Sequence, residues 1–592
     1  EAKNNTVNLG DGTHALAPGT TIGKIYGGNQ SDVSGNKLNV KANATAENIG
    51  NFDKVTFYLR SGGVTQTETA PLLTLTDTAG TNVNLGSIGV DGWVKGKRIL
   101  MENATAGQLN ATAYSGGRHS NFDDKREYHI DTNTASGTAT QILYEGMQFK
   151  DATSTETVTT NAEIYGGRSR FGNSTVGNTL TIENGAHQNA YGGKTEGSGT
   201  NLEEGNSRDN TVLMKNGTVN NSIYGGYTAG SGNATGNTVT ITGGSMTDVY
   251  GGFTNGTGAT TGNTVKLGDG EHNLAAGTNI VGTVFGGNKA DVTDNTLNIN
   301  TNAQAGNIKN FDHLNFNLNS HALTQSMPVL RLNSGATGNL DWRKLDVNAE
   351  KFNAPIKTYE AYNLVLMENA NGISFQQGAT NTYTAAGGVK STTSGDFEFT
   401  IDTANHTASS TQVTAAGFKF KNHAATYNEI PAHNEAWAGR TNIGNKVEKN
   451  TLTVSGGTIT TAAYGGLVIN NKPSATTGDA EKNTVNITGG TVANVYGAQV
   501  RTKAGSASEN TAKISGGTVS HVYGASLTAA GATGSVTKSR VDVTGGAVTG
   551  DVYGGQIVDT GATGSVTESQ VDITGGSVGG NIYGGRTNGS GD

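Results

Sequence analysis

The sequence contains no cysteine and only six prolines among its 592 residues. The lack of cysteine excludes disulfide-stapled secreted domains, and the low proline content excludes collagen-like and proline-rich chains. Charged residues make up 15% and aromatic residues 6% of the chain. The net charge is −8, and no basic stripe of the kind that marks a nucleic-acid surface is present. Since no run of 18 apolar residues occurs, we predict no membrane-spanning helix.

Catalytic motifs are absent as well. The sequence has no His-Glu-x-x-His helix, no Gly-x-Ser-x-Gly elbow and no Walker loop. The eleven histidines are scattered, although His14 and His272 occupy matching positions in two "LGDGxH" segments. We interpret both as turn residues that follow an Asp-Gly pair, in preference to metal ligands or catalytic groups.

Acidic residues show no catalytic or metal-binding arrangement. The pairs Asp123–Asp124 and Glu203–Glu204 lie in polar loop sequence and are expected to be solvated. Glycosidic cleavage needs two carboxylates at a defined separation, and the linear sequence shows no such pair. Repeated calcium sites need regular aspartates in glycine turns, whereas these turns continue with Ser, Thr or Ala. We therefore predict no enzyme activity, no cofactor and no metal site.

Glycine is abundant, with 89 residues, against an expectation of roughly 7%. Together with Thr, Asn, Ser and Val it supplies short strands and tight turns. A tyrosine or phenylalanine followed by Gly-Gly or Gly-Ala recurs at Tyr26, Tyr165, Tyr191, Tyr224, Tyr250, Phe285, Tyr464, Tyr496, Tyr523, Tyr553 and Tyr583. Within each run the copies lie 26 to 35 residues apart. Periods of this length indicate a solenoid, a propeller or an array.

One half of each repeat has a fixed length. An asparagine precedes the tyrosine by 13 or 14 residues, at Asn178, Asn210, Asn237, Asn450, Asn483 and Asn510. Serine takes this position in the last two copies, at Ser539 and Ser569. The other half varies, from 13 residues between Tyr224 and Asn237 to 19 between Tyr191 and Asn210. Insertions of this kind map to loops on one face of a solenoid.

The fixed half is predicted to form strand, turn and strand. "NTVTI" from Asn237 alternates apolar and polar residues, as a half-buried strand does. The following "TGG" supplies glycine for a turn with positive φ, and "VYGG" forms a second short strand. Each unit is too small to bury its own apolar face, so the units must stack. We predict an all-β chain folded as a right-handed parallel β-helix, or β-solenoid.

Stacking places equivalent residues in columns. We predict a hydrogen-bonded asparagine ladder at a turn, which serine at positions 539 and 569 is able to continue. The tyrosine column is predicted to be structural, through stacked rings. An exposed aromatic stripe for sugar or protein binding is the functional alternative. The sequence leaves the direction of the rings open because the residue before each tyrosine is also apolar, and neighbouring strand residues face opposite sides.

A larger duplication is present. The segment that begins "NTVNLGDG" at Asn5 is copied as "NTVKLGDG" from Asn263, and both copies continue with "NFD" and "LMEN" stretches. The rhythm breaks near 45–160 and 302–435, where irregular β-helix turns or β-rich insertions are expected. We therefore divide the chain into β-helix at 1–44, a first irregular β-rich module at 45–160, β-helix at 161–301, a second module at 302–435 and β-helix at 436–592. The final "TNGSGD" matches loops that lead into another repeat, so we expect a longer array.

The "TGGxVxxxVYGG" units at 544–555 and 574–585 resemble the glycine-rich passenger domains of type V autotransporters, especially those of Gram-negative Firmicutes such as the Veillonella and Selenomonas group. The "NFDKVTFYL…PLLTL" stretch from Asn51 is similar to a segment of such passengers. The resemblance covers the whole chain in repeat style. It implies an extended β-helix exported through an outer-membrane barrel outside this sequence, with a role in adhesion, co-aggregation or biofilm formation.

The sequence is compatible with three functions. The first is a cell-surface adhesin, extracellular and anchored at the outer membrane, whose partners are surface proteins or glycans of other bacteria or of host cells. Self-association is a further expected contact, and nucleic acid is not an expected partner. The second is a structural stalk that presents another domain, which the near-identical segments from 531 and 561 favour. The third is a carbohydrate-active enzyme on the same fold, which would need a carboxylate cluster beside an aromatic platform.

Overall fold

The computed structural model describes residues 2–105, 109–112, 117–134, 139–157, 160–197, 205–319, 327–334, 339–340, 344–352, 357–372, 376–377, 390–403, 411–430, 432–469 and 477–591. The chain is a β-solenoid of about 17 turns, with 57% of residues in strands. The all-β prediction is therefore confirmed. Contacts between residues divide the chain into two compact units. Unit 1 comprises Glu1–Leu267, Leu274–Leu297 and Ile308–Asp312, and unit 2 comprises Gly268–Asn273, Asn298–Asn307 and His313–Asp592.

A regular coil contains three parallel strands. One example runs through β22 (Ala234–Thr235), β23 (Thr238–Ile241) and β24 (Ser245–Thr254). Gly236, between the first two strands, has φ 67°, and Gly244, between the second and third, has φ 85°. These positive angles explain the glycines of the repeat, because other residues rarely adopt them. The next coil follows in register, and the strand, turn and strand predicted for the fixed half are present.

Unit 1 begins with parallel coils that form three sheets. The first sheet contains β1 (Thr6–Leu9), β3 (Lys37–Val40), β5 (Lys54–Tyr58) and β8 (Ile88–Asp91). The second begins with β2 (Ile22–Tyr26), β4 (Ala44–Gly50), β6 (Leu73–Leu75) and β9 (Gly96–Asn103), and β7 (Thr81–Asn84) pairs with β10 (Leu109–Thr112). A short 3-10 helix, Leu85–Ser87, precedes β8.

The pairing then changes from parallel to antiparallel. Strand β13 (Gln141–Gln148) adds to β9 in the antiparallel direction, followed by β12 (Arg126–Thr132) and β11 (Arg118–Asn121). This antiparallel sheet ends the first set of coils, and a new parallel stack begins after it.

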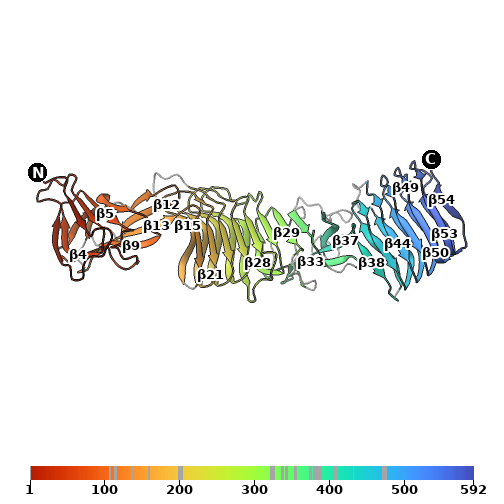
Figure 1. The fold of residues 1–592 in the computed structure, drawn as a ribbon, viewed down its shortest axis with the longest axis horizontal. Coiled ribbons are helices and arrows are strands. Elements are labelled where there is room, and N and C mark those ends of the chain that lie inside the picture. The colour runs from red at the N-terminus through yellow and green to blue at the C-terminus, as the bar shows by residue number, and fades with distance from the viewer. Residues whose placement is uncertain are drawn as a thin grey trace. The chain divides into compact units, whose positions relative to one another are not determined.

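The second stack of unit 1 again has three sheets, drawn from orange to green in Figure 1. The first contains β14 (Thr153–Glu156), β17 (Thr179–Ile182), β20 (Thr211–Met214), β23 and β25 (Thr264–Leu267). The second contains β15 (Asn161–Ser169), β18 (Ala186–Thr195), β21 (Thr218–Thr228), β24 and β26 (Asn279–Gly287). The third contains β16 (Thr175–Val176), β19 (Ser207–Arg208) and β22. Strands β27 (Thr296–Ile299) and β28 (Ala303–Lys309) lie in the stretch where the two units divide.

Unit 2 repeats this plan. Its first strands are β29 (His313–Asn317), β30 (Leu330–Leu332), β31 (Asn339–Leu340), β32 (Leu345–Asn348), β33 (Tyr362–Asn369) and β34 (Gln376–Gln377). An antiparallel sheet follows, in which β33 pairs with β37 (Gln412–Lys419), β37 with β36 (Phe397–Thr403) and β36 with β35 (Lys390–Ser394). The duplication seen in the sequence therefore includes the change from parallel to antiparallel pairing.

A parallel stack completes unit 2. One row of strands contains β38 (Ala424–Tyr427), β41 (Thr451–Val454), β44 (Thr484–Ile487), β47 (Thr511–Ile514), β50 (Arg540–Val548) and β53 (Gln570–Val578). The next contains β39 (His433–Thr441), β42 (Thr458–Val468), β45 (Thr491–Val500), β48 (Thr518–Leu527), β51 (Val552–Ile557) and β54 (Ile582–Thr587). Five short strands form the third, namely β40 (Val447–Glu448), β43 (Ala480–Glu481), β46 (Ala507–Ser508), β49 (Val536–Thr537) and β52 (Val566–Thr567). The predicted five-part division of the sequence stays a prediction, since nothing in these contacts tests its boundaries.

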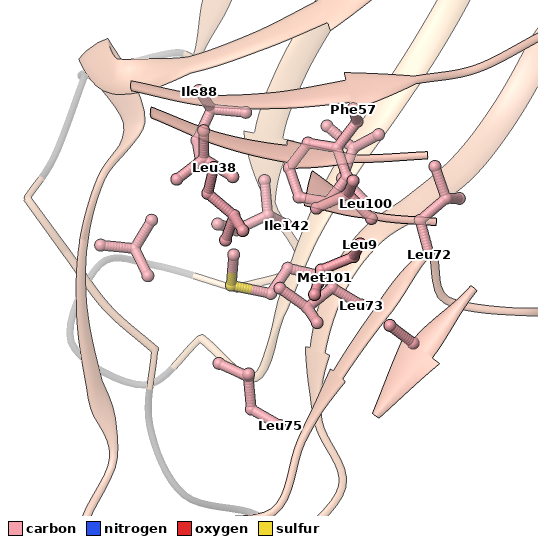
Figure 2. Packing of buried hydrophobic residues seen from close by; sticks show 14 of the residues in the cluster. Leu9, Leu38, Phe57, Leu72, Leu73, Leu75, Ile88, Leu100, Met101 and Ile142 are labelled. Carbon is pink, nitrogen blue, oxygen red and sulfur yellow. The ribbon is translucent and has the colours of Figure 1, made fainter. Parts of the chain in front are cut away.

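Apolar side chains fill the interior of the coils. In the first coils of unit 1, Leu38, Phe57, Leu73 and Met101 are fully buried and point toward one another (Figure 2). The regular stack of unit 2 buries mainly valine, alanine and isoleucine. Because each turn contacts only its neighbours, stability depends on interfaces between successive turns.

Candidate functional site

The predicted asparagine column is a buried hydrogen-bond ladder in each unit. The side-chain Oδ1 of Asn237 accepts from both the backbone N and the Nδ2 of Asn210, at 3.0 Å each. The Nδ2 of Asn237 donates to Oδ1 of Asn263 and to the carbonyl of Ser207, again at 3.0 Å. The six predicted asparagines, Asn178, Asn210, Asn237, Asn450, Asn483 and Asn510, are all fully buried. The ladder therefore satisfies polar groups that water cannot reach.

The ladder differs from the sequence prediction at its ends. In unit 1 it continues through Asn263 to Asn295. Asn263 was not predicted because a loop insertion lengthens its spacing to Phe285, and Asn295 was not predicted because no tyrosine or phenylalanine with Gly-Gly follows it in its repeat. In unit 2 the serines do not continue it. The Ser539 hydroxyl donates to the carbonyl of Thr537, two residues away, and the buried Ser569 hydroxyl has no partner. A serine side chain is too short to reach the neighbouring turn, so the expected continuation was wrong.

The direction of the tyrosine column, which the sequence left open, is outward. The residues before the tyrosines face the core, and Ile223, Val249, Val495 and Val522 are fully buried, whereas Ile582 of the last coil is exposed. The tyrosine rings therefore stack on the outside of the coil. Neighbouring side chains nevertheless bury Tyr191, Tyr464 and Tyr553. Neighbouring rings are paired in the sheet register and nearly parallel, as for Tyr191 and Tyr224, whose centroids lie 5.1 Å apart at an interplanar angle of 9°.

The columns include the predicted tyrosines from Tyr165 onward, whereas Tyr26 pairs with Gly50 and is exposed. In unit 1 the centroid distances are 5.4, 5.1, 5.2 and 4.4 Å along Tyr165, Tyr191, Tyr224, Tyr250 and Phe285. In unit 2 they are 5.3, 4.6, 5.0 and 5.0 Å along Tyr464, Tyr496, Tyr523, Tyr553 and Tyr583. Burial raises the pKa of Tyr250 and of Tyr496 to about 12. The hydroxyl groups therefore stay protonated at neutral pH.

Unit 1 carries a second aromatic row beside this column. Tyr227 lies 5.3 Å from Tyr191 and 5.2 Å from Tyr224, at angles of 74° and 70°. Phe253 lies at 5.3 and 5.2 Å from Tyr224 and Tyr250, at 76° and 87°. Because the column rings cover each other's faces, Tyr227 and Phe253 meet them at their edges. Sequence analysis missed this row, although both residues stand three positions after a column tyrosine.

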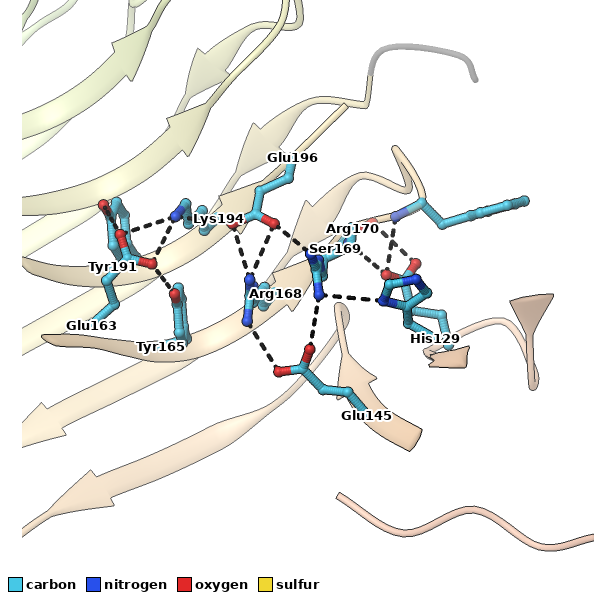
Figure 3. Close-up of polar contacts among 12 residues, drawn as sticks. His129, Glu145, Glu163, Tyr165, Arg168, Ser169, Arg170, Tyr191, Lys194 and Glu196 are labelled. Atoms are coloured by element: carbon cyan, nitrogen blue, oxygen red, sulfur yellow. Dashed lines mark hydrogen bonds and ion pairs between the residues drawn. The ribbon is translucent and has the colours of Figure 1, made fainter. Parts of the chain in front are cut away.

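A charged network lies on the outer face of unit 1, beside the first two tyrosines of the column (Figure 3). Glu163 accepts hydrogen bonds from the hydroxyls of Tyr165 and Tyr191, and Lys194 Nζ lies 2.9 Å from both Glu163 and Glu196. Burial raises the pKa of Glu163, but the hydrogen bonds from Tyr165 and Lys194 outweigh it and leave the pKa lowered. Lys194 also lies 4.8 Å from the centre of the Tyr191 ring, in cation–π contact.

The network extends toward the antiparallel sheet. Arg168 contacts Glu145 and Glu196 at 3.2 Å each, and Arg170 contacts Glu145 at 3.0 Å and His129 Nδ1 at 3.3 Å (Figure 3). The three carboxylates and three cations of this network balance in charge. The network therefore has a structural explanation as a set of mutually paired charges.

A buried glutamate closes the first turn of each parallel stack. Glu127 on β12 is fully buried. Its Oε1 accepts from the backbone N of Arg170 and of Phe171, and its Oε2 accepts from Ser169 Oγ at 3.1 Å and Asn173 Nδ2 at 2.7 Å. In a later turn, the N of Glu196 donates instead to the carbonyl of Ser169. The carboxylate thus replaces the carbonyl of a preceding turn.

Unit 2 has the same arrangement. Glu398 on β36 is fully buried and accepts from the N of Asn442 and from Thr441 Oγ1 at 2.6 Å each, and from Asn445 Nδ2 at 3.0 Å. Burial raises the pKa of both carboxyl groups, and the hydrogen bonds they accept offset only part of it. Sequence reasoning missed these residues. The available signal was a shared glutamate three positions before each "IDT" segment, at Ile130 and Ile401.

The two predicted turn histidines lie in exposed loops. His14 Nδ1 contacts Asp11 Oδ2 at 2.8 Å, and His272 Nδ1 contacts Asp269 Oδ2 at 2.9 Å. Each aspartate also accepts from backbone N–H groups of its own turn. Asp123 pairs with Arg126, whereas Glu203 and Glu204 lie outside the described residues. The two histidine–aspartate pairs and the Asp123–Arg126 pair therefore stabilise local turns.

Comparisons with known proteins give no relative. No protein-family model, no curated protein and no solved structure matches the chain. Within the part of the chain that the structure describes, no helix has the length and apolar character of a membrane-spanning segment.

Proposed function

We propose that the chain is the β-solenoid passenger of a type V autotransporter and acts as an adhesin at the bacterial surface. The proposal is supported by the stacked parallel coils, by the absence of cysteine and by the passenger-like repeats. Disulfides hinder a chain that crosses a membrane barrel unfolded, and turns that contact only their neighbours suit stepwise folding during export.

The observation that carries the adhesive role is the double aromatic row on the outer face of β21 and β24. Tyr224, Tyr227, Tyr250 and Phe253 form one contact cluster outside the coil. Their burial is intermediate, so part of each side chain meets solvent. Contiguous apolar surface on the outside of a protein marks an interaction site. The expected partners are proteins or glycans on other bacteria or host cells, and the role requires no enzymatic step.

A structural stalk is the second candidate. It is favoured by the last coils of unit 2, where the segments from 531 and 561 are nearly identical. In that unit the residues three positions after the tyrosines include Gln499, Ser526 and Gln556, which are all buried. Among the described residues of this face there is no second aromatic row, which suits a spacer.

Binding of the whole purified chain to cells distinguishes the two functions. Fluorescently labelled chain is incubated with other bacteria and with epithelial cells, and excess unlabelled chain serves as the competitor. The adhesin predicts saturable binding that the competitor displaces. A labelled chain that binds no cell type above the level of a labelled control protein would leave the stalk as the function.

A further inference from the structure

We propose that the hairpin of β11 and β12 is an acid-sensitive latch on the first turn of the second stack in unit 1. Side chains of the hairpin contact this turn, residues 169–173. The carboxylate that closes the turn comes from β12, and Asn173 Nδ2 donates to Asn121 Oδ1 on β11 at 2.6 Å. His129 Nδ1 lies 3.3 Å from a guanidinium nitrogen of Arg170 (Figure 3). The latch holds at neutral pH and loosens when His129 gains a proton.

The contact with Arg170 fixes the protonation state of His129. A guanidinium group only donates hydrogen bonds and stays charged in proteins. His129 Nδ1 is therefore the acceptor, which requires a neutral imidazole with its proton on Nε2. A second proton would turn Nδ1 into a donor that faces another donor, and would place two cations 3.3 Å apart. Only 7% of the His129 side chain is exposed, so water screens this repulsion weakly.

Two neighbours on the hairpin act on His129 in opposite directions. The ring of His119 on β11 stacks on the ring of His129, with centroids 4.1 Å apart and an interplanar angle of 5°. A proton on either ring therefore places positive charge against the other. Asp131 favours the charged ring, since its Oδ2 lies 3.8 Å from His129 Nε2. The Asp131 side chain is 40% exposed, however, so solvent weakens its attraction.

The other carboxylates that face the histidine, among the described residues, already have partners. Glu145 on β13 and Glu196 after β18 contact Arg170, at 3.0 and 3.5 Å, and both also pair with other cations of the network described above. Glu127, two residues before His129 on the same strand, accepts hydrogen bonds from the turn that it closes. A proton on the imidazole would therefore add charge to a network whose charges are paired.

Unit 2 has the same closure without the histidine–arginine contact. Thr400 follows the closing glutamate of unit 2 by two residues, as His129 does in unit 1. Asn442 donates its backbone N to that glutamate, as Arg170 does in unit 1. Both members of the contact are thus replaced by uncharged side chains. Closing the turn does not need the pair, which adds to unit 1 a group that titrates near neutral pH.

The direction of the pH effect follows from this hydrogen bond. The latched hairpin needs a neutral His129, whereas an imidazole in the unfolded chain gains a proton at about pH 6.5. The contribution of the latch is therefore fully present above that pH and is lost as the pH falls below it. The closing glutamates have the opposite dependence, since burial raises their pKa. Because each unit carries one, their effect cancels when the two units are compared.

Hydrogen exchange of the whole chain tests the latch at about pH 7 and about pH 5, on either side of the ordinary histidine pKa. Peptides from 165–173 and from 437–445 report the two closed turns, after correction for the intrinsic exchange rate. The test variant is His129→Thr with Arg170→Asn, which places the residues of unit 2 in unit 1. The control variant is His14→Thr, in an exposed loop, and circular dichroism verifies that both variants fold.

We expect acid to raise exchange of the unit 1 turn, relative to the unit 2 turn, by about tenfold in wild type and in the control, the equivalent of one pKa unit. The test variant should show no difference between the units. Equal responses of the two turns in wild type, or the wild-type response in the folded test variant, would overturn the latch.

A second measurement on the wild type needs no variant. Exchange of the imidazole Cε1 hydrogen, followed by mass spectrometry across the same pH range, reports the protonation of each histidine. We expect His129 to gain its proton at a lower pH in the folded chain than in a synthetic peptide of residues 126–132. Protonation at the same or a higher pH in the folded chain would overturn the proposal.

Discussion

The regular stacks of the two units share one backbone plan and differ on their outer faces. Both carry the buried asparagine ladder, the stacked tyrosines and a glutamate that closes the first turn. Unit 1 adds Tyr227 and Phe253, where unit 2 has the buried Gln499 and Ser526. The comparison separates residues that build the solenoid, which occur in both units, from residues that only one unit carries. The second group is where specific binding is expected.

The largest predicted effect concerns the ladder. Asn237→Ala removes the side-chain acceptor of the Asn210 backbone N, one of the partners of Asn210 Nδ2 and the side-chain donor to the carbonyl of Ser207, so it should destabilise the neighbouring turns by about 3 kcal/mol. Native-state hydrogen exchange of β20 and β23 measures this loss turn by turn. Ser539→Ala is the control and should cost about 0.5 kcal/mol, because the Ser539 hydroxyl bonds only to the carbonyl of Thr537 in its own turn. Similar losses for both would contradict the ladder.

The closing glutamates should behave alike in both units. Glu127→Gln and Glu398→Gln each bring an amide N–H₂ against groups that donate hydrogen bonds. Each should destabilise the first turn of its own stack by about 2 kcal/mol. Exchange rates in β15 and β39 measure the effect. Loosening of only one stack, or of distant turns, would show that the two glutamates do not share a role.

The same carboxyl groups predict a pH dependence. Their pKa values are raised in the folded chain by burial, so their contribution to stability is present below the unfolded value of about 4.3 and is lost as pH rises through the raised value. The double variant Glu127→Gln with Glu398→Gln should lack this part of the pH dependence. Urea midpoints of wild type and variant across that pH range provide the test, and parallel curves would contradict it.

A smaller difference is expected between the two tyrosine columns. Tyr224 contacts four rings, and Tyr523 contacts two. Tyr224→Leu should therefore cost about 1–2 kcal/mol more than Tyr523→Leu, given about 0.5–1.5 kcal/mol per aromatic pair. Hydrogen exchange of β21 and β48 gives the two values. A greater cost at Tyr523 would mean that the second row does not support the column.

The smallest effect concerns the residue immediately before a ladder asparagine, which has a positive φ. At this position unit 2 has Lys482, before Asn483, with φ 55°, whereas unit 1 has Gly262, before Asn263, with φ 67°. A Cβ at Gly262 would meet only the N of Gly236, at 3.8 Å. Gly262→Lys should therefore cost only about 1 kcal/mol, the strain of a left-handed residue. A loss as large as that of Asn237→Ala would show an unrecognised constraint in unit 1.

The sequence predicted what repeats and missed what occurs once per unit. The periods of asparagine and tyrosine predicted the parallel coils and both columns, because every copy adds to the same pattern. Glu127 and Glu398 act at single positions in irregular sequence, so no period indicates them. The antiparallel sheets escaped prediction because parallel and antiparallel strands share the same alternation. Tyr227 and Phe253 were missed because unit 2 has other residues in that column.

The central claim, that unit 1 binds through its added aromatic row and unit 2 does not, is tested most directly by hydroxyl-radical footprinting of the whole chain. The measurement compares side-chain oxidation of the chain free in solution with that of the chain bound to the cells of the binding test. We expect protection of Tyr227 and Phe253 and unchanged oxidation of Tyr496 and Tyr523. Protection confined to the tyrosines of unit 2, with Tyr227 and Phe253 oxidised as before, would contradict it.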